Sequence, residues 1–215
     1  MILREIGLIS DPPQPPEGYR PLHDQTRCVS ALVERFLPQI VTENEWKISI
    51  HLSSESDFDP ILTISGVAIV TIERNVPAFF DMDNSAKKIF AIDAIEEGAA
   101  LAAAHYQWPA DRILSALDEA RQLDLVNEWN FRPKWNPSRR LRASVFCRHE
   151  TETFSAELQV EDRQGALVAQ KHLFDEIPSE FCFVPRLGDV KWIGKSSVCL
   201  YDKAGNIVGE ELDLN

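Results

Sequence analysis

Residues 84–107, NSAKKIFAIDAIEEGAALAAAHYQ, and residues 108–124, WPADRILSALDEARQLD, decide the fold. Apolar residues recur at helical spacing in both stretches, which predicts two consecutive helices. The first stretch is apolar almost all round and keeps one polar stripe, formed by Asp93, Glu96 and Glu97. Because a surface helix needs an apolar arc of only about 100°, this wide arc predicts a central helix on which flanking strands pack.

Small residues line one face of the first predicted helix, namely Ala91, Ala94, Gly98 and Ala102. A glycine in a helix interior costs about 1 kcal/mol relative to alanine, so Gly98 needs a compensating interaction. We expect that compensation to be the close approach of a neighbouring element. The short connection between the helices, residues 107–110, predicts an antiparallel pair or a corner.

Other periodic segments precede the helical pair. Residues 24–37 carry a helical apolar stripe, and residues 45–52 alternate as a half-buried strand does. Residues 61–72 are apolar on both faces. They predict either one long central strand with a bulge at Gly66 or a hairpin that turns at Ser65-Gly66.

The C-terminal half changes to a period of two residues. From Arg140 to Leu212 the alternation and its intervening turn formers predict five or six antiparallel strands. The fold class predicted is therefore α+β. Residues 1–126 form a helical pair packed with strands, and residues 127–215 form an antiparallel β-meander. We expect the two halves to pack together as one compact unit.

The charge of the chain restricts its partners. There are 34 Asp and Glu against 22 Lys and Arg, a formal net charge of -12. Such a surface repels nucleic acid and anionic lipid and favours a basic protein partner. No apolar run reaches the roughly 20 residues of a membrane span, and residues 1–10 make a poor signal peptide. We therefore expect contact with neither nucleic acid nor a membrane.

The four cysteines indicate a reducing setting. None is spaced as CxxC, and each has apolar neighbours in the sequence; they are Cys28, Cys147, Cys182 and Cys199. Reduced core thiols show this pattern, and disulfides are rare in the cytosol. The sequence thus predicts a cytoplasmic protein with four buried thiols.

Two loops are rich in aspartate. Their four carboxylates are Asp57, Asp59, Asp81 and Asp83. The DxDxS spacing is typical of the start of a calcium loop, but the sixth position is not glycine, and Ile92 occupies the twelfth, where a glutamate is needed. No metal is therefore expected. Capping of the long helix by Asn84 or Ser85 explains part of this cluster. The hypothesis for the four aspartates is a partner-binding surface.

Aromatic and basic residues alternate after the helical pair. From Asn127 to Arg148 there are six basic residues and one acidic, a local charge of +5 that leaves -17 for the remainder. Two interpretations stay open. In the first, the segment is a linker that packs its tryptophans between the halves, while Arg140 faces Glu161 across a hairpin. In the second, it binds an anionic ligand through Trp129, Arg132, Lys134, Trp135, Arg139 and Arg140.

No catalytic residue is predicted. Cys147 and His149 share one face of a strand, but side chains two residues apart are separated by about 7 Å, too far for a nucleophile and its base. Nucleotide-binding, hydrolase and zinc-protease motifs are missing from the sequence, so no cofactor is expected.

These observations favour non-catalytic binding of a basic protein by an acidic surface. The sharpest version is a bacterial immunity or inhibitor protein that neutralises a toxin, since such proteins are often small, acidic and free of catalytic motifs. Two alternatives stay open. One is an enzyme with a site in the cleft between the two halves, acting on an anionic substrate. The other is a structural or adaptor subunit.

Overall fold

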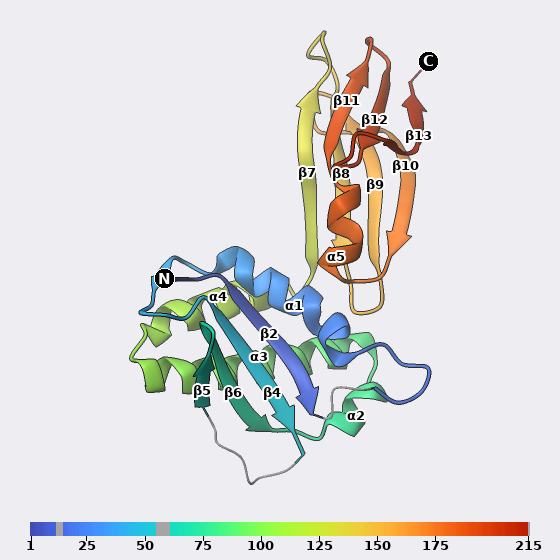
Figure 1. Ribbon diagram of the computed structural model, residues 1–215. Coiled ribbons are helices and arrows are strands. Elements are labelled where there is room, and N and C mark those ends of the chain that lie inside the picture. The colour runs from blue at the N-terminus through green and yellow to red at the C-terminus, as the bar shows by residue number, and fades with distance from the viewer. Residues whose placement is uncertain (12–14, 55–60, 215) are drawn as a thin grey trace. The chain divides into compact units, whose positions relative to one another are not determined.

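The computed structural model describes residues 1–11, 15–54 and 61–214, which belong to two compact units, Met1–Asn127 and Glu128–Asn215 (Figure 1). The described residues contain five α-helices and thirteen strands. The predicted α+β class is confirmed, and so is the antiparallel meander of the C-terminal half. That the halves pack together stays a prediction.

The first unit is built on a four-stranded sheet. Its order is β2-β4-β6-β5, with β2, β4 and β6 parallel and β5 antiparallel to β6. The strands are β1 (Ile2–Leu3), β2 (Glu5–Asp11), β3 (Ile40–Val41), β4 (Lys47–Ser53), β5 (Ile61–Ile64) and β6 (Val67–Glu73). β1 and β3 form a separate antiparallel pair. The sequence predicted a strand at β4 and strand structure over β5 and β6, but neither β3 nor the parallel pairing.

Helices line the sheet. They are α1 (Leu22–Phe36), α2 (Val76–Phe80), α3 (Asn84–Tyr106) and α4 (Ala110–Gln122). α3 contacts β2, β4 and β6 and runs behind the strands in Figure 1, α1 contacts β2, and α4 contacts α1 and α3. The predicted pair of consecutive helices, with the first one central, is confirmed. The short helix α2 was not predicted. None of the helices in the described ranges combines the length and apolar character required to cross a membrane.

The apolar stretch after residue 60 is a hairpin rather than one long strand. β5 and β6 are joined by Ser65 and Gly66, whose φ angles are 51° and 80°. Two successive positive φ angles are typical of the tight turns that match the twist of a hairpin. A Cβ on Gly66 would also lie 2.8 Å from Cδ1 of Trp46, so the turn has no room for a side chain.

The predicted close approach at Gly98 is confirmed. A Cβ built on Gly98 would lie 2.6 Å from Cγ1 and 2.7 Å from Cδ1 of Ile50 on β4. Ile50 is fully buried, so its side chain has no solvent into which it could turn. α3 therefore lies against the sheet at a separation that only glycine permits.

The second unit contains two antiparallel sheets, ordered β10-β9-β8-β7 and β11-β12-β13. The strands are β7 (Asn127–Trp135), β8 (Arg142–His149), β9 (Phe154–Glu161), β10 (Leu167–Glu176), β11 (Asp189–Ile193), β12 (Ser197–Tyr201) and β13 (Ile207–Asp213). A short helix, α5 (Glu180–Phe183), and a 3-10 turn, Val184–Arg186, connect the sheets. Buried residues of both sheets form one apolar core, which includes Val145, Leu158, Val190 and Leu200.

Two details of this half differ from expectation. Residues 127–135 form strand β7, so the interpretation as a linker is wrong. Arg142, not Arg140, pairs with Glu161, at 2.7 Å. The register is displaced by two residues because the β8–β9 turn holds four residues, closed by a hydrogen bond from Glu150 N to Thr153 O.

We expect Gly98→Ala to lower the free energy of unfolding by about 1 to 3 kcal/mol, since the new methyl group overpacks Ile50. Ile50→Ala removes the obstructing atoms, so the double variant should be more stable than the sum of the two single effects predicts. Chemical denaturation of all four proteins measures this coupling.

Gly7→Ala is the matched control for this experiment. A Cβ on Gly7 meets only Cε of Lys47, at 3.9 Å, and should change stability little. Strict additivity of Gly98→Ala and Ile50→Ala would contradict the close contact.

Candidate functional site

The predicted acidic loops are only partly described. Asp57 and Asp59 lie outside the described residues. Asp81 and Asp83 are exposed, but Asp83 has a structural role: its Oδ1 accepts a hydrogen bond of 2.8 Å from Ala86 N at the start of α3. Asp83, rather than Asn84 or Ser85, is therefore the N-cap of α3.

Replacement of Asp83 by alanine should lower stability by about 1 kcal/mol, because the capping hydrogen bond is lost. Asp83→Asn keeps an acceptor oxygen in the same place and should cost only a few tenths of a kcal/mol. Thermal denaturation distinguishes the two, with exposed Asp81→Ala as the control. Equal losses of stability for Asp83→Ala and Asp83→Asn would show that the charge of Asp83, not its capping hydrogen bond, stabilises the start of α3.

Acidic charge is concentrated in the first unit. Residues 1–127 contain 20 acidic and 10 basic residues, whereas residues 128–215 contain 14 and 12. Part of it is neutralised on the helices, where Arg121 pairs with Asp93 and Glu96. Any attraction of a basic partner by long-range charge therefore acts mainly on the first unit.

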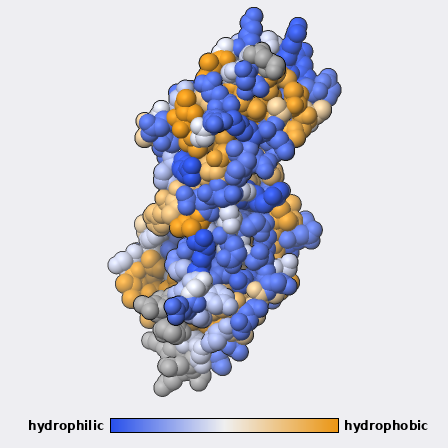
Figure 2. Space-filling view, turned by 90° about the vertical axis from the view of Figure 1, so that its right-hand side faces the viewer, coloured by the Kyte–Doolittle hydropathy of each residue, from blue (hydrophilic) through white to orange (hydrophobic). Residues whose placement is uncertain are grey.

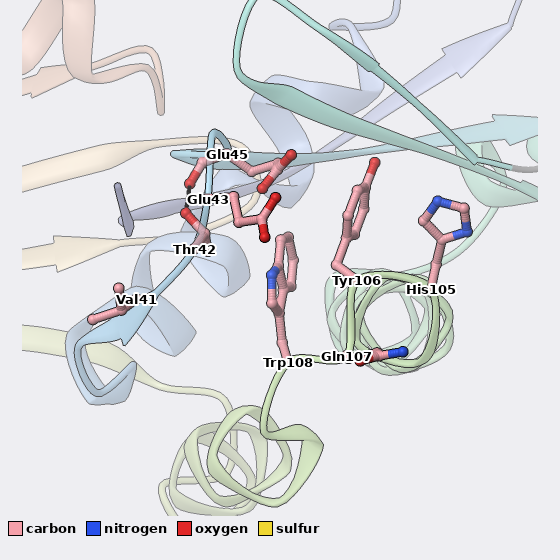
Figure 3. A pocket seen from close by; sticks show the side chains of 8 residues that line it. All are labelled: Val41, Thr42, Glu43, Glu45, His105, Tyr106, Gln107 and Trp108. Carbon is pink, nitrogen blue, oxygen red and sulfur yellow. Dashed lines mark hydrogen bonds between the residues drawn. The ribbon is translucent and has the colours of Figure 1, made fainter.

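A pocket of about 510 Å³ lies in this unit, at the C-terminal end of α3 (Figure 3). One side is the loop between β3 and β4, and the other is the end of α3 with the residues that follow it. The lining residues are Val41, Thr42, Glu43, Glu45, His105, Tyr106, Gln107 and Trp108. Figure 3 shows the carboxylates of Glu43 and Glu45 extending from the loop toward the aromatic side.

Backbone hydrogen bonds hold the acidic loop on both sides of its carboxylates. Thr42 N donates to Met1 O at 2.9 Å, and Trp46 N donates to Gly66 O at 2.9 Å. The Thr42 hydroxyl also donates to the carbonyl of Glu45. The loop is thus preorganised, which reduces the entropy lost when a ligand binds.

The aromatic side is held equally well. Tyr106 and Trp108 stack, with ring centroids 4.7 Å apart and planes inclined by 17°. Gln107, between them, takes the left-handed conformation with φ 57°, and the Trp108 N–H donates to Ala103 O. The Tyr106 hydroxyl shares a hydrogen bond of 2.6 Å with the Thr63 hydroxyl on β5.

The electrostatics of the pocket favour a cation. Glu45 is only 5% exposed, and within the described residues its side chain accepts one hydrogen bond, from Asn44 N at 3.3 Å. Neither Glu43 nor Glu45 forms an ion pair with any residue of the described ranges. The C-terminal end of α3 adds the negative end of a long helix dipole. Aromatic faces also attract cations, so the two carboxylates, the end of the helix and the rings of Tyr106 and Trp108 share this preference.

A metal ion is not the cation that this geometry suggests. Across the described parts of the chain, no three His, Cys, Asp or Glu side chains gather closely enough to hold one. Two carboxylates beside stacked rings suit an organic cation, such as a lysine or arginine side chain, better than a bare ion.

Sequence reasoning did not find this pocket. Glu43 and Glu45 lie about sixty residues before Tyr106 and Trp108, so no local spacing joins them. The one available signal was the cluster HYQW at residues 105–108, where three aromatic rings follow an apolar helix.

The structure divides the predicted anionic-ligand residues into groups. Arg132 and Lys134 both pair with Asp189, at 3.6 and 2.6 Å. The hydrogen bond from Lys134 lowers the pKa of the Asp189 carboxyl below its usual value. Trp129 packs against the core of the second unit. Only Trp135, Arg139 and Arg140 of the six stay exposed without a carboxylate partner among the described residues.

Cys147 and His149 do not form a catalytic pair. Cys147 is fully buried, and its burial raises the pKa of the thiol to about 12. His149 is also buried, with Nε2 3.1 Å from the carbonyl oxygen of Pro178. A thiol that stays protonated at neutral pH is a poor nucleophile.

Comparisons with protein-family models, with curated proteins and with solved structures found no match.

The cysteines should react unequally with a disulfide reagent. Cys28, Cys147 and Cys199 are buried, but Cys182 is half-buried, so the expectation of four buried thiols is wrong for that residue. We expect one thiol to react in the folded protein at pH 7 to 8 and the other three only after unfolding. Cys182→Ser should abolish the early reaction. Early labelling that persists in this variant and maps to Cys147 would contradict its burial and its raised pKa.

Proposed function

We propose that this protein binds a basic protein partner without catalysis, and that the pocket formed by Glu43, Glu45, Tyr106 and Trp108 receives a cationic side chain of that partner. The acidic excess of residues 1–127 supports the proposal at long range. The pocket supports it at short range, because it offers a cation both carboxylates and aromatic surface.

The observation that carries the proposal is the buried carboxylate of Glu45. A buried charge without a counter-ion is costly for a fold, and natural proteins keep such groups mainly where function requires them. A lysine or arginine side chain in the pocket would pair with Glu45, which has no ion-pair partner among the described residues. Partners of a desolvated charge pair are often the residues that dominate an interface.

The predicted aspartate loop has a secondary place in this proposal. Asp81 and Asp83 precede α3, and the pocket follows it. A helix of 23 residues spans about 35 Å, so the loop and the pocket are at opposite ends of α3. We assign the pocket the anchoring role and the exposed aspartates the steering of a basic partner toward the first unit.

A cytoplasmic setting is part of the proposal, supported by four free cysteines among the described residues. A toxin-neutralising immunity or inhibitor protein is its most specific form, supported by the acidic charge and the lack of catalytic motifs in the sequence. The structure offers no specific observation in favour of the enzyme or the adaptor alternative.

The test uses two double variants of equal net charge. Glu43→Gln/Glu45→Gln removes the pocket carboxylates, and Asp118→Asn/Glu119→Gln removes two exposed carboxylates from α4. Each variant and the wild type are immobilised and exposed to lysate of the native host, and retained proteins are identified by mass spectrometry. Dissociation constants of the purified partner are then measured by surface plasmon resonance.

A basic protein should be retained by the wild type and by the α4 variant. Its affinity for the pocket variant should fall about 30-fold or more, since the loss of one side of a desolvated charge pair costs about 2 kcal/mol or more. Glu45→Gln should not lower the melting temperature, because the carboxylate serves binding rather than stability. Equal affinities of the two double variants, or retained proteins that are acidic, would overturn the proposal.

A further inference from the structure

A second pocket, of about 650 Å³, lies within residues 128–215. It is lined by Trp135, Asn136, Pro137, Arg139 and Arg163. Trp135 is the last residue of β7, the next three belong to the connection between β7 and β8, and Arg163 belongs to the turn after β9. Two arginines and an indole ring thus meet at one site, although Arg163 lies outside the basic segment that the sequence marks.

Asn136 fixes the shape of this site. It is only 3% exposed, and its side-chain oxygen accepts hydrogen bonds from Arg140 N at 3.0 Å and Leu141 N at 3.3 Å. Its side-chain nitrogen donates to Lys195 O at 3.1 Å. One buried amide therefore ties its own connection, at Arg140 and Leu141, to the turn at Lys195, so the loop that follows Trp135 and carries Arg139 is preorganised.

The arginines of this pocket are available for a ligand. Arg163 Nε donates to the carbonyl oxygen of Arg139 at 2.7 Å. This hydrogen bond holds the Arg163 guanidinium beside Arg139. Neither Arg139 nor Arg163 forms an ion pair within the described residues. Nearby carboxylates are engaged elsewhere: Glu161 pairs with Arg142, and Asp162 accepts two backbone N–H groups of its own turn.

Trp135 gives the pocket a flat apolar wall. Trp135 is 47% exposed, so part of its ring is accessible to a ligand. The guanidinium of Arg142 lies 5.9 Å from the ring centroid. Figure 2 shows a face of the molecule that is mostly hydrophilic, with hydrophobic residues in separate patches. Single exposed aromatics next to arginines are typical of sites that stack a planar ring.

We infer that this pocket binds a mononucleotide, with the phosphate held by Arg139 and Arg163 and the base stacked on Trp135. Guanidinium groups match phosphate oxygens in paired hydrogen bonds, and an indole face stacks on any base. A pocket of this volume holds one nucleotide. A long nucleic acid is not the ligand we infer, because residues 128–215 carry 14 acidic against 12 basic residues and so have no net positive charge. The inference does not depend on the acidic pocket of the first unit.

The test is calorimetric titration of the full chain with AMP, ribose 5-phosphate, adenosine and inorganic phosphate. AMP should bind best, ribose 5-phosphate and phosphate more weakly, and adenosine most weakly. Arg139→Gln/Arg163→Gln should weaken AMP at least tenfold. Trp135→Leu should weaken AMP while leaving ribose 5-phosphate unchanged, since the sugar phosphate has no base to stack.

Arg132→Gln/Lys134→Gln is the matched control. It also removes two cations, but these are already paired with Asp189, so AMP affinity should be unchanged. Melting temperatures of all variants confirm that they are folded. The inference is overturned if AMP shows no saturable binding, if inorganic phosphate binds as tightly as AMP, or if both double variants weaken AMP equally.

Discussion

The first unit depends on the contact between Gly98 and Ile50. It sets the distance between α3 and the central strand β4, and no other residue than glycine fits at that point of the helix. Because α3 is one rigid helix of 23 residues, fixing its middle also fixes its ends. The N-terminal end then carries the Asp83 cap, and the C-terminal end brings Tyr106 and Trp108 opposite the loop before β4. A packing constraint in the core thus positions the acidic pocket.

The acidic pocket also shows how the fold places charge. Glu45 could pair with a basic residue of its own chain, as Glu5 does with Lys47 at 2.6 Å, but the loop is held by backbone hydrogen bonds instead. The backbone bonds of Thr42 and Trp46 therefore fix the loop without any ion pair to the Glu45 carboxylate among the described residues. This arrangement suits the proposed role of the pocket, because a preorganised loop loses little entropy when a ligand binds.

Local periodicity predicted most of the fold. The two helices, strand β4 and the alternation after Arg140 are all visible in the sequence because the spacing of apolar residues follows the period of each element. β4 was expected to be half-buried, but Ser49 and Ser53 on its second face are also buried. Gly98 was informative because glycine is costly in a helix. Parallel pairing of β2, β4 and β6 was not predictable in this way, since it depends on contacts between residues far apart. The acidic pocket was not predictable for the same reason. Its two sides are far apart in the sequence and meet only when the loop before β4 and the end of α3 come together.

The net charge of a sequence segment does not show which of its charged side chains are unpaired in the folded protein. The segment from Asn127 to Arg148 has a formal excess of five positive charges, which suggested one extended anion site. In the folded chain, Asp189 forms ion pairs with both Arg132 and Lys134. Glu161 pairs with Arg142, and Glu128 pairs with Arg148. Four of the six cations are therefore paired with carboxylates across strands. The nucleotide pocket proposed above uses Arg139 from this segment and Arg163 from the turn after β9. A basic segment in a β-rich protein indicates a binding site only after its cross-strand carboxylates have been assigned.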